Sequence, residues 1–186
     1  MSDNQIEYFD VYNEKKEKTG KTLPRKGSFL QEGEYQLIVL AILERPDHKF
    51  LITRRSLNKK WAAGDWEVSG GGAQAGESSY DAVCRETLEE TGLDVRNAGG
   101  GCVYTYSNVD LKRGDNYFVD IYHFVMDFDH SDVHPQESET EGFDIVPFEE
   151  IDRLGKEGHF LHYERILQAL EAEKKPDFDL QRAREC

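Results

Sequence analysis

Hydrophobic residues along the chain form short runs and helical stripes separated by polar turns. A continuous apolar run at 37–43 has the length and composition of a strand that is buried on both faces. A proline–aspartate turn separates it from 49–55, which we expect to be its partner strand. Aromatic and β-branched residues predict two further strands at 102–106 and 117–128.

Three segments carry helical patterns. The first extends from Ser78 to about Thr91, and Gly92 suits the left-handed position that often ends a helix. A short helix is expected at 148–154, and a stripe of apolar residues at helical spacing predicts another at 160–173. Strands on both sides of a central helix, followed by a closing helix, indicate a mixed α/β (α+β) sandwich.

Charge and length limit the partners and the domain count. The 186 residues contain 23 Lys and Arg against 37 Asp and Glu, so the formal net charge is 23 − 37 = −14. We expect no nucleic-acid polymer and no membrane as partner, because this charge repels phosphate backbones and anionic lipid surfaces. The length predicts a single domain, with a leader or hairpin at 1–34, a core at 35–155 and a C-terminal helix and polar tail at 156–186.

The cysteines and the N-terminus are typical of an intracellular protein. Cys84, Cys102 and Cys186 are odd in number and lack the spacing of a zinc site, so neither a disulfide framework nor bound zinc is indicated. Residues 1–5 have neither the basic nor the apolar region of a signal peptide. The chain is therefore expected in the cytoplasm.

Three glutamates crowd one face of the predicted helix at 78–91. Glu86, Glu89 and Glu90 are spaced three and four residues apart, where like charges cost about 0.2–0.5 kcal/mol per pair. The last helical turn also favours cations over carboxylates. A divalent cation would offset both the repulsion between the carboxylates and their unfavourable position in the helix dipole, because Mg²⁺ binds carboxylate and phosphate oxygens together. The alternative is a solvated acidic face, softened by an ion pair between Arg85 and Glu89.

The spacing of the whole segment resembles the Nudix box, the signature of the Nudix hydrolase family. Eight of nine specified positions match, and the exception is Thr87, where the pattern has a bulky aliphatic residue. The matching residues are Gly71, Glu77, Arg85, Glu86, Glu89, Glu90, Gly92 and Leu93. The resemblance implies the Nudix fold, a mixed β-sheet sandwiched between helices. It also implies a metal-dependent hydrolase that cleaves a nucleoside diphosphate linked to another moiety X, by attack of water at phosphorus.

The resemblance assigns metal ligands and a positioning residue. Glu86, Glu89 and Glu90 would bind Mg²⁺ or Mn²⁺, and the Gly71 carbonyl could add a ligand because glycine allows close backbone approach. Arg85 would orient the carboxylates by charge-assisted hydrogen bonds.

The general base is left open between a glutamate of the box, Glu89, and an acid in a distal loop. In the acidic segment 136–141, Glu139 is the first choice and Glu141 the next.

A compact set of basic residues between the second strand and the glycine-rich loop could bind the substrate phosphates. These residues are Arg54, Arg55, Lys59 and Lys60. The expected partner is thus a small-molecule diphosphate, and the family resemblance makes a homodimer an open option.

Two alternatives stay open. The leader, with Asp10, Gly20 and Arg25, resembles the isopentenyl diphosphate isomerase-like branch of the superfamily, but the strand at 64–69 lacks the cysteine that such isomerases use. A nucleotide-sensing Nudix module that binds without cleaving is the other alternative. Such modules commonly lose box acids, whereas all three are present here.

Overall fold

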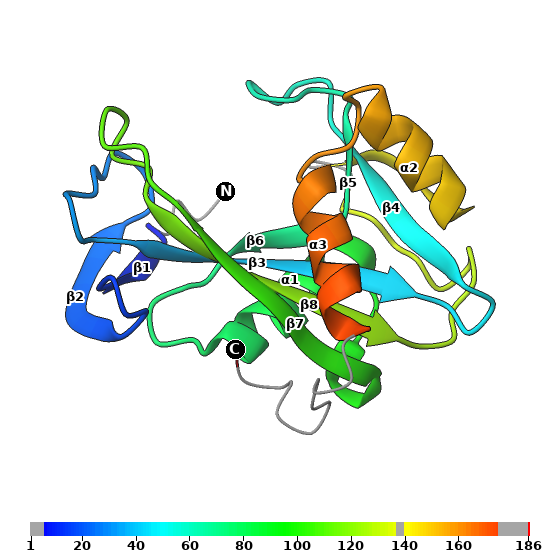
Figure 1. Ribbon diagram of the computed structural model, residues 1–186, viewed down its shortest axis with the longest axis horizontal. Helices are drawn as coiled ribbons and strands as arrows, with labels where there is room; N and C mark the ends of the chain where they lie inside the picture. The colour runs from blue at the N-terminus through cyan, green and yellow to red at the C-terminus, as the bar shows by residue number, and fades with distance from the viewer. Residues whose placement is uncertain (1–5, 137–139, 175–185) are drawn as a thin grey trace.

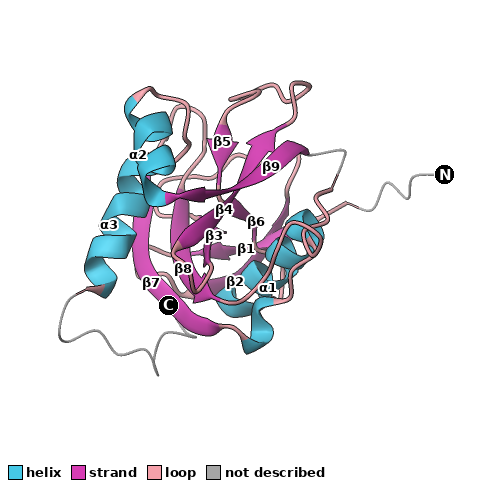
Figure 2. Cartoon of the chain, turned by 90° about the vertical axis from the view of Figure 1, so that its right-hand side faces the viewer, coloured by secondary structure: helices cyan, strands magenta, loops and turns pink. Residues whose placement is uncertain are grey.

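The computed structural model describes residues 6–136, 140–174 and 186. One mixed β-sheet lies between helices, and a separate two-stranded hairpin stands at one end of it (Figures 1 and 2). The predicted mixed α/β architecture is therefore confirmed. The sheet strands are β3 (Gln36–Glu44), β4 (Lys49–Arg55), β5 (Trp66–Glu67), β6 (Ser69–Gly72), β7 (Gly99–Asn108), β8 (Tyr117–Val125) and β9 (Thr140–Pro147).

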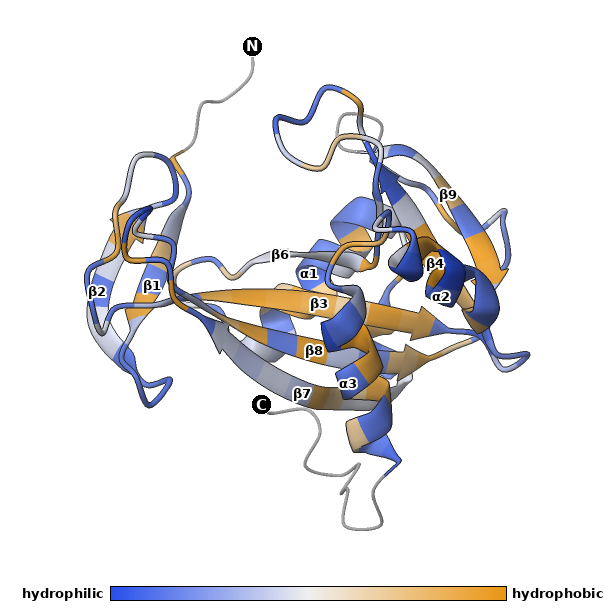
Figure 3. Cartoon of the chain, turned by 45° about the horizontal axis from the view of Figure 1, so that its top comes forward, coloured by the Kyte–Doolittle hydropathy of each residue, from blue (hydrophilic) through white to orange (hydrophobic). Residues whose placement is uncertain are grey.

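Strand β3 is the centre of the sheet because its apolar side chains are buried on both faces (Figure 3). It pairs in parallel with β8 and antiparallel with β4 and β6. Strand β7 extends the sheet beyond β8, while β5 and β9 pair with β4.

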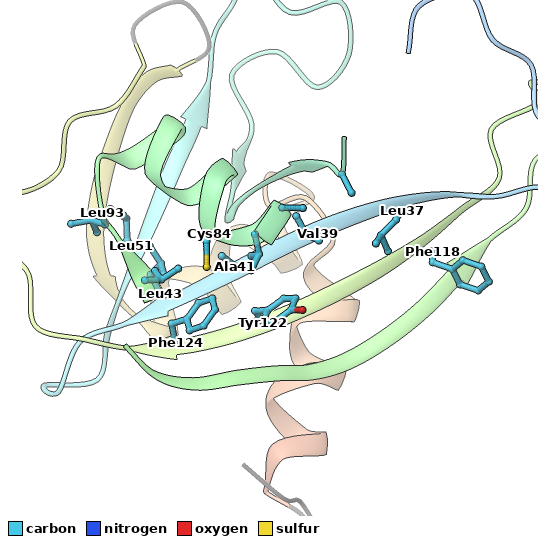
Figure 4. Close-up of a cluster of buried hydrophobic side chains, with 14 of the residues drawn as sticks. Leu37, Val39, Ala41, Leu43, Leu51, Cys84, Leu93, Phe118, Tyr122 and Phe124 are labelled. Atoms are coloured by element: carbon cyan, nitrogen blue, oxygen red, sulfur yellow. The ribbon is translucent and has the colours of Figure 1, made fainter. Parts of the chain in front are cut away.

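Alternate residues of β3 serve two cores, as the two-residue period of a strand requires. Leu37, Val39, Ala41 and Leu43 belong to the cluster that also holds Ala82 and Val83 of α1 (Ser79–Thr91) (Figure 4). Leu40 and Ile42 belong to the cluster on the other face, covered by α2 (Phe148–Lys156) and α3 (Tyr163–Glu173). None of the described helices has the length and apolar character needed to cross a membrane.

The ends of α1 agree with the sequence pattern. Ser78 and Asp81 form a capping box, in which Asp81 N–H donates to Ser78 Oγ and Ser78 N–H donates to Asp81 Oδ2. Gly92 has φ 79° and its N–H donates to the Leu88 carbonyl, so the predicted left-handed end of the helix is confirmed. The last turn contains no basic residue to offset the helix dipole.

Some element boundaries differ from those predicted. Helix α3 begins at Tyr163 and not at 160, because the backbone at 159–161 pairs with Trp66: Trp66 N–H donates to the His159 carbonyl and Leu161 N–H to the Trp66 carbonyl. Strand β8 ends at Val125, before the predicted 128. The acidic residues before 145 are expected to form a loop, but Thr140–Pro147 pairs with β4 as strand β9.

The prediction that the cysteines form no disulfide is wrong for one pair. Cys102 on β7 and Cys186 are joined by a disulfide, with their Cα atoms 5.6 Å apart. Their separation of 84 residues gives no local signal, because only tertiary folding brings them together. Cys84 is free, and its side chain points from α1 into the core (Figure 4).

The N-terminal hairpin consists of β1 (Tyr8–Tyr12) and β2 (Lys18–Pro24) and has a small apolar core of its own. At its tip, Lys16 Nζ lies 2.5 Å from the buried carboxylate of Asp120 on β8. Backbone groups of 75–77, just before α1, bind the hairpin through Tyr8 O, Asp10 Oδ2 and Lys18 Nζ. The hairpin therefore braces the segment that leads into α1.

A buried histidine joins three elements at the far end of the sheet. Nε2 of His123 on β8 lies 2.7 Å from Glu44 Oε2 on β3, and Nδ1 lies 2.5 Å from Glu173 Oε2 on α3. Burial opposes protonation of His123, but hydrogen bonding and the charges of the two carboxylates outweigh it and raise the histidine pKa above 6.5.

We expect the stabilisation from His123 to be complete below pH 6.5 and to be lost as the pH rises through the raised pKa of the folded protein. The folded state binds the proton more tightly, and each unit of pKa shift contributes about 1.4 kcal/mol. Urea unfolding across this range should show a falling free energy for the wild type and a flatter profile for His123→Gln. His48→Gln is the control, because His48 also pairs with Glu44 but its side chain is exposed to solvent. An unchanged pH profile in His123→Gln would contradict the assignment.

Candidate active site

The carboxylate of Glu90 is held against the first residues of β6. Ser69 Oγ and Gly70 N–H both donate to Glu90 Oε2, at 2.7 and 2.9 Å. Burial raises the pKa of Glu90 to about 7 in spite of these two hydrogen bonds, and the charges of Glu86 and Glu67 act in the same direction as burial. Glu90 thus has a fixed position at the edge of the sheet and an environment that disfavours an uncompensated negative charge.

Glycine at position 71 makes room for the carboxylate of Glu86. A Cβ atom on Gly71 would lie 2.4–2.5 Å from the carboxyl atoms of Glu86, closer than van der Waals contact allows. The glycine is therefore required for close approach of a side chain to the backbone. Burial raises the pKa of Glu86, and the positive charge of Arg85 acts against this shift.

Arg85 connects the acidic residues at this end of the molecule. Its Nε and Nη2 donate to the two carboxylate oxygens of Glu77, at 2.6 and 2.9 Å. Its Nη1 donates to Glu86 Oε1 and to Glu89 Oε2, at 2.9 and 3.1 Å, and Nη2 also reaches the Gly72 carbonyl. All three nitrogens of Arg85 are therefore bound within the protein, and the ion pairs offset the crowding of carboxylates.

The three box glutamates occupy one end of α1 without converging on a single point. Glu90 is held by β6, whereas Glu86 and Glu89 share Arg85 as a partner. Their carboxylate oxygens are the donor type that a hard divalent cation such as Mg²⁺ prefers, and Gly71 lets the carboxylate of Glu86 lie against the backbone of β6.

Another group of ligand atoms does converge elsewhere in the described part of the chain. Ligand atoms of Cys102, Asp120 and Cys186 lie within 4.8 Å of one another. The two cysteines are joined in the disulfide, and the Asp120 carboxylate accepts hydrogen bonds from Lys16, Ser79 Oγ and Thr105 Oγ1. These ligand atoms therefore already form structural bonds within the protein.

The two arginines expected to bind phosphate have other partners in this structure. Arg55 Nη1 donates to both carboxylate oxygens of Glu67 at 3.0 Å. Arg54 Nε donates to the Gly64 carbonyl at 2.9 Å, and its guanidinium lies 5.9 Å from the ring centre of Trp66. Lys59 and Lys60 lie in the connection between β4 and β5. The ion pair of Arg55 with Glu67 connects this group to the box, because the charge of Glu67 acts on Glu90.

The two acids considered for the distal base are placed differently. Glu139 lies outside the residues that the structure describes. Glu141 lies on β9, where its Oε2 accepts a hydrogen bond of 3.4 Å from Leu57 N–H.

Two further residues, Ser69 and Arg25, contact the box, and neither was expected there from the sequence. Ser69 directly precedes three glycines at the start of β6, a position that could have signalled a side chain close to the box. Arg25 follows β2, and its Nη2 donates to the Ala73 carbonyl at 2.9 Å. No sequence signal places Arg25 there, because 48 residues separate the two.

Comparison with known proteins agrees with this geometry. The NUDIX domain model matches residues 34–169. An uncharacterised Nudix hydrolase of Listeria monocytogenes is 31% identical over 159 residues, which cover 85% of this chain and 90% of the relative. A solved structure from Deinococcus radiodurans superposes with a TM-score of 0.63 at 22% identity, covering 81% of this chain and 90% of that one. The MutT protein of Methanosarcina mazei superposes with a TM-score of 0.60 at 26% identity, covering 76% and 96%.

The chain belongs to the Nudix family and is a Nudix hydrolase. Enzymes of this family carry out pyrophosphatase-type hydrolysis and generally use divalent metal ions.

Thr87, the one departure from the box pattern, lies on the buried side of α1. Its side chain is fully buried, and Oγ1 has no hydrogen-bond partner among the described residues. We expect Thr87→Val to raise the free energy of unfolding by about 1 kcal/mol, because the substitution removes an unsatisfied buried hydroxyl. Thr91→Val is the matched control and should destabilise, since Thr91 Oγ1 donates to the Thr87 carbonyl. Urea unfolding measures both, and a loss of stability in Thr87→Val would contradict the prediction.

Gly71→Ala should lower metal affinity and turnover by about 10- to 100-fold, a typical effect of disturbing the surroundings of a metal ligand. The added Cβ must displace the carboxylate of Glu86. Gly99→Ala on β7 is the control, because among the residues that the structure describes its Cβ would meet only the Val125 carbonyl, at 3.7 Å. Calorimetric Mg²⁺ titration would measure the change, and wild-type affinity in Gly71→Ala would show that Glu86 does not need this space.

Proposed function

We propose that the chain is a Mg²⁺-dependent hydrolase that cleaves a nucleoside diphosphate linked to another moiety X. The observation that carries this proposal is the arrangement of Glu86 and Glu90 beside the glycine backbone of β6, with Arg85 holding the neighbouring carboxylates. This arrangement offers oxygen ligands to a cation at an edge where a substrate phosphate could approach it.

Glu86, Glu89, Glu90 and the Gly71 carbonyl would hold the metal. When bound, Mg²⁺ or Mn²⁺ supplies positive charge that neutralises adjacent phosphates and lowers the pKa of a bound water. Ser69 and Gly70 hold Glu90 in one orientation. Arg85 orients Glu86 and Glu89 in the same way, and its bonds to Glu77 prevent it from turning toward the substrate.

Glu89 is suited to take the proton of the attacking water. Its side chain is more exposed than that of Glu86, and within the described part of the chain only one ion pair, with Arg85, restrains it. As the oxygen of water bonds to phosphorus, the bond from phosphorus to the bridging oxygen breaks, and the proton passes to the base. Glu139 is retained as the alternative base.

Arg54, Arg55, Lys59 and Lys60 would counter the negative charge of the whole chain around an anionic substrate. For Arg55, substrate phosphate would have to compete with Glu67. A small-molecule diphosphate as substrate, cytoplasmic location and a homodimer are further parts of the proposal.

The alternatives gain no support from the geometry. Cys84 points into the core, and burial raises the pKa of its thiol, while Cys102 is joined in the disulfide. Neither cysteine is placed for proton transfer at the β6 edge, as an isomerase would require. All three box glutamates are present, in contrast to the loss of acids that is common in sensing modules.

Glu90→Gln should lower metal-dependent cleavage by at least about 100-fold, because a ligand loss exceeds the effect typical of outer-shell partners. The measurement is product release from a panel of nucleoside diphosphate derivatives that also includes isopentenyl diphosphate. Glu171→Gln on α3 is the control for a glutamate remote from the box. Undiminished cleavage by a folded Glu90→Gln variant would refute the assigned role, and formation of an isomerised product would favour the isomerase.

A further inference from the structure

Arg25 and Glu86 flank the short strand β6 from opposite sides. A Cβ on Gly71 would meet the carboxylate of Glu86, whereas a Cβ on Gly72 would overlap the guanidinium of Arg25 at Nη1. Successive side chains of a strand point to opposite faces, so these two clashes place the arginine and the glutamate on the two faces of one strand. Both groups approach backbone that carries no side chain of its own.

The guanidinium of Arg25 keeps one nitrogen available. Nε donates to Glu7 Oε2 at 3.1 Å and Nη2 to the Ala73 carbonyl at 2.9 Å, but Nη1 has no hydrogen-bond partner among the described residues. Arg85, by contrast, uses all of its nitrogens within the protein. The charge of Arg25 also acts on Glu86, where it favours the carboxylate form.

The hairpin holds this arginine in place before any ligand arrives. Backbone N–H of Arg25 donates to the Glu7 carbonyl at 2.7 Å, and Ala75 N–H donates to the Tyr8 carbonyl at 2.8 Å. The contact of Lys16 with Asp120 fixes the other end of the hairpin. A pre-positioned cation loses less conformational entropy on binding than a mobile surface side chain.

A cavity of about 310 Å³ opens beside the same guanidinium. Its polar lining includes Arg25, Arg113, Ser28, Gln36 and Asp115. A negatively charged group that enters from this side would meet two arginines, offset by one carboxylate.

We propose that Arg25 is a phosphate-binding residue, which donates Nη1 to a non-bridging oxygen of the substrate diphosphate from the face of β6 opposite the box glutamates. The N-terminal hairpin is then part of the active site and supplies a cation that the box lacks, since Arg85 is bound by Glu77. A guanidinium suits this task because it remains charged and forms directional hydrogen bonds to phosphate. This inference rests on the proposed hydrolase function.

Arg25→Gln is expected to weaken binding of inorganic pyrophosphate, measured by calorimetry in the presence of Mg²⁺, by about 10- to 100-fold, as expected for loss of a charge-assisted hydrogen bond. The KM of whichever diphosphate the wild type cleaves should rise by a similar factor, with a smaller change in kcat. Arg25→Lys should recover part of the affinity. Lys21→Gln in the same hairpin, which removes an ion pair with Glu34, is the control and should leave both values unchanged.

Gly72→Ala supplies a second test that keeps the arginine and its hairpin. The added Cβ must displace Nη1, so this variant should weaken pyrophosphate binding as Arg25→Gln does. In the double variant the two effects should not add, because both remove the same interaction. Fully additive losses, or wild-type pyrophosphate affinity and KM in Arg25→Gln, would overturn the inference.

The two proposals fail in distinguishable ways. Wild-type turnover that is lost in Glu90→Gln but unchanged in Arg25→Gln would support the hydrolase and refute the role of Arg25. Pyrophosphate binding that depends on Arg25, without cleavage of any nucleoside diphosphate derivative, would support the phosphate site and refute the proposed nucleoside diphosphate cleavage.

Discussion

Arg85 makes the acidic end of α1 compatible with a folded protein. Three glutamates gather there, two in the last helical turn, and no basic residue lies in that turn to offset the helix dipole. Arg85 relieves part of the repulsion by binding Glu86 and Glu89, while Glu77 holds the guanidinium from the preceding loop. Partly buried ion pairs depend on their geometry, so the positions of the loop, helix and carboxylates are coupled. Glu90, outside this network, relies on Ser69 and Gly70 of β6.

The glycines of β6 let charged side chains approach the backbone beside the box glutamates. Gly71 leaves space for Glu86, and Gly72 leaves space for Arg25, so charged groups of opposite sign reach one strand from its two faces. Strand β3 fixes β6 on one side, and the N-terminal hairpin braces the segment that follows. The hairpin therefore contributes to the proposed chemistry as well as to the architecture, through the charge of Arg25 and the contacts that hold it.

Prediction from sequence succeeded where local physical chemistry decides the outcome. The apolar run at 37–43 became the central strand, since seven consecutive apolar residues require burial on both faces. Helix α1 followed its capping signals at Ser78 and Gly92. Prediction failed for β9, whose acidic residues gave no strand pattern, and for the start of α3, where pairing of Trp66 with 159–161 outweighs helical periodicity. Both errors concern contacts between distant segments.

The sequence by itself determined the family, the box helix and the acids and arginine that it presents, because their spacing along one helix is set by helical geometry. Tertiary structure alone decided which partners these residues meet. Ser69 reaches Glu90 across 21 residues, Arg25 reaches Ala73 across 48, and Cys102 reaches Cys186 across 84. It also decided that Arg55 is paired with Glu67 while Arg25 keeps a free nitrogen among the described residues. Such pairings depend on where distant backbone segments pack, and no local spacing encodes them.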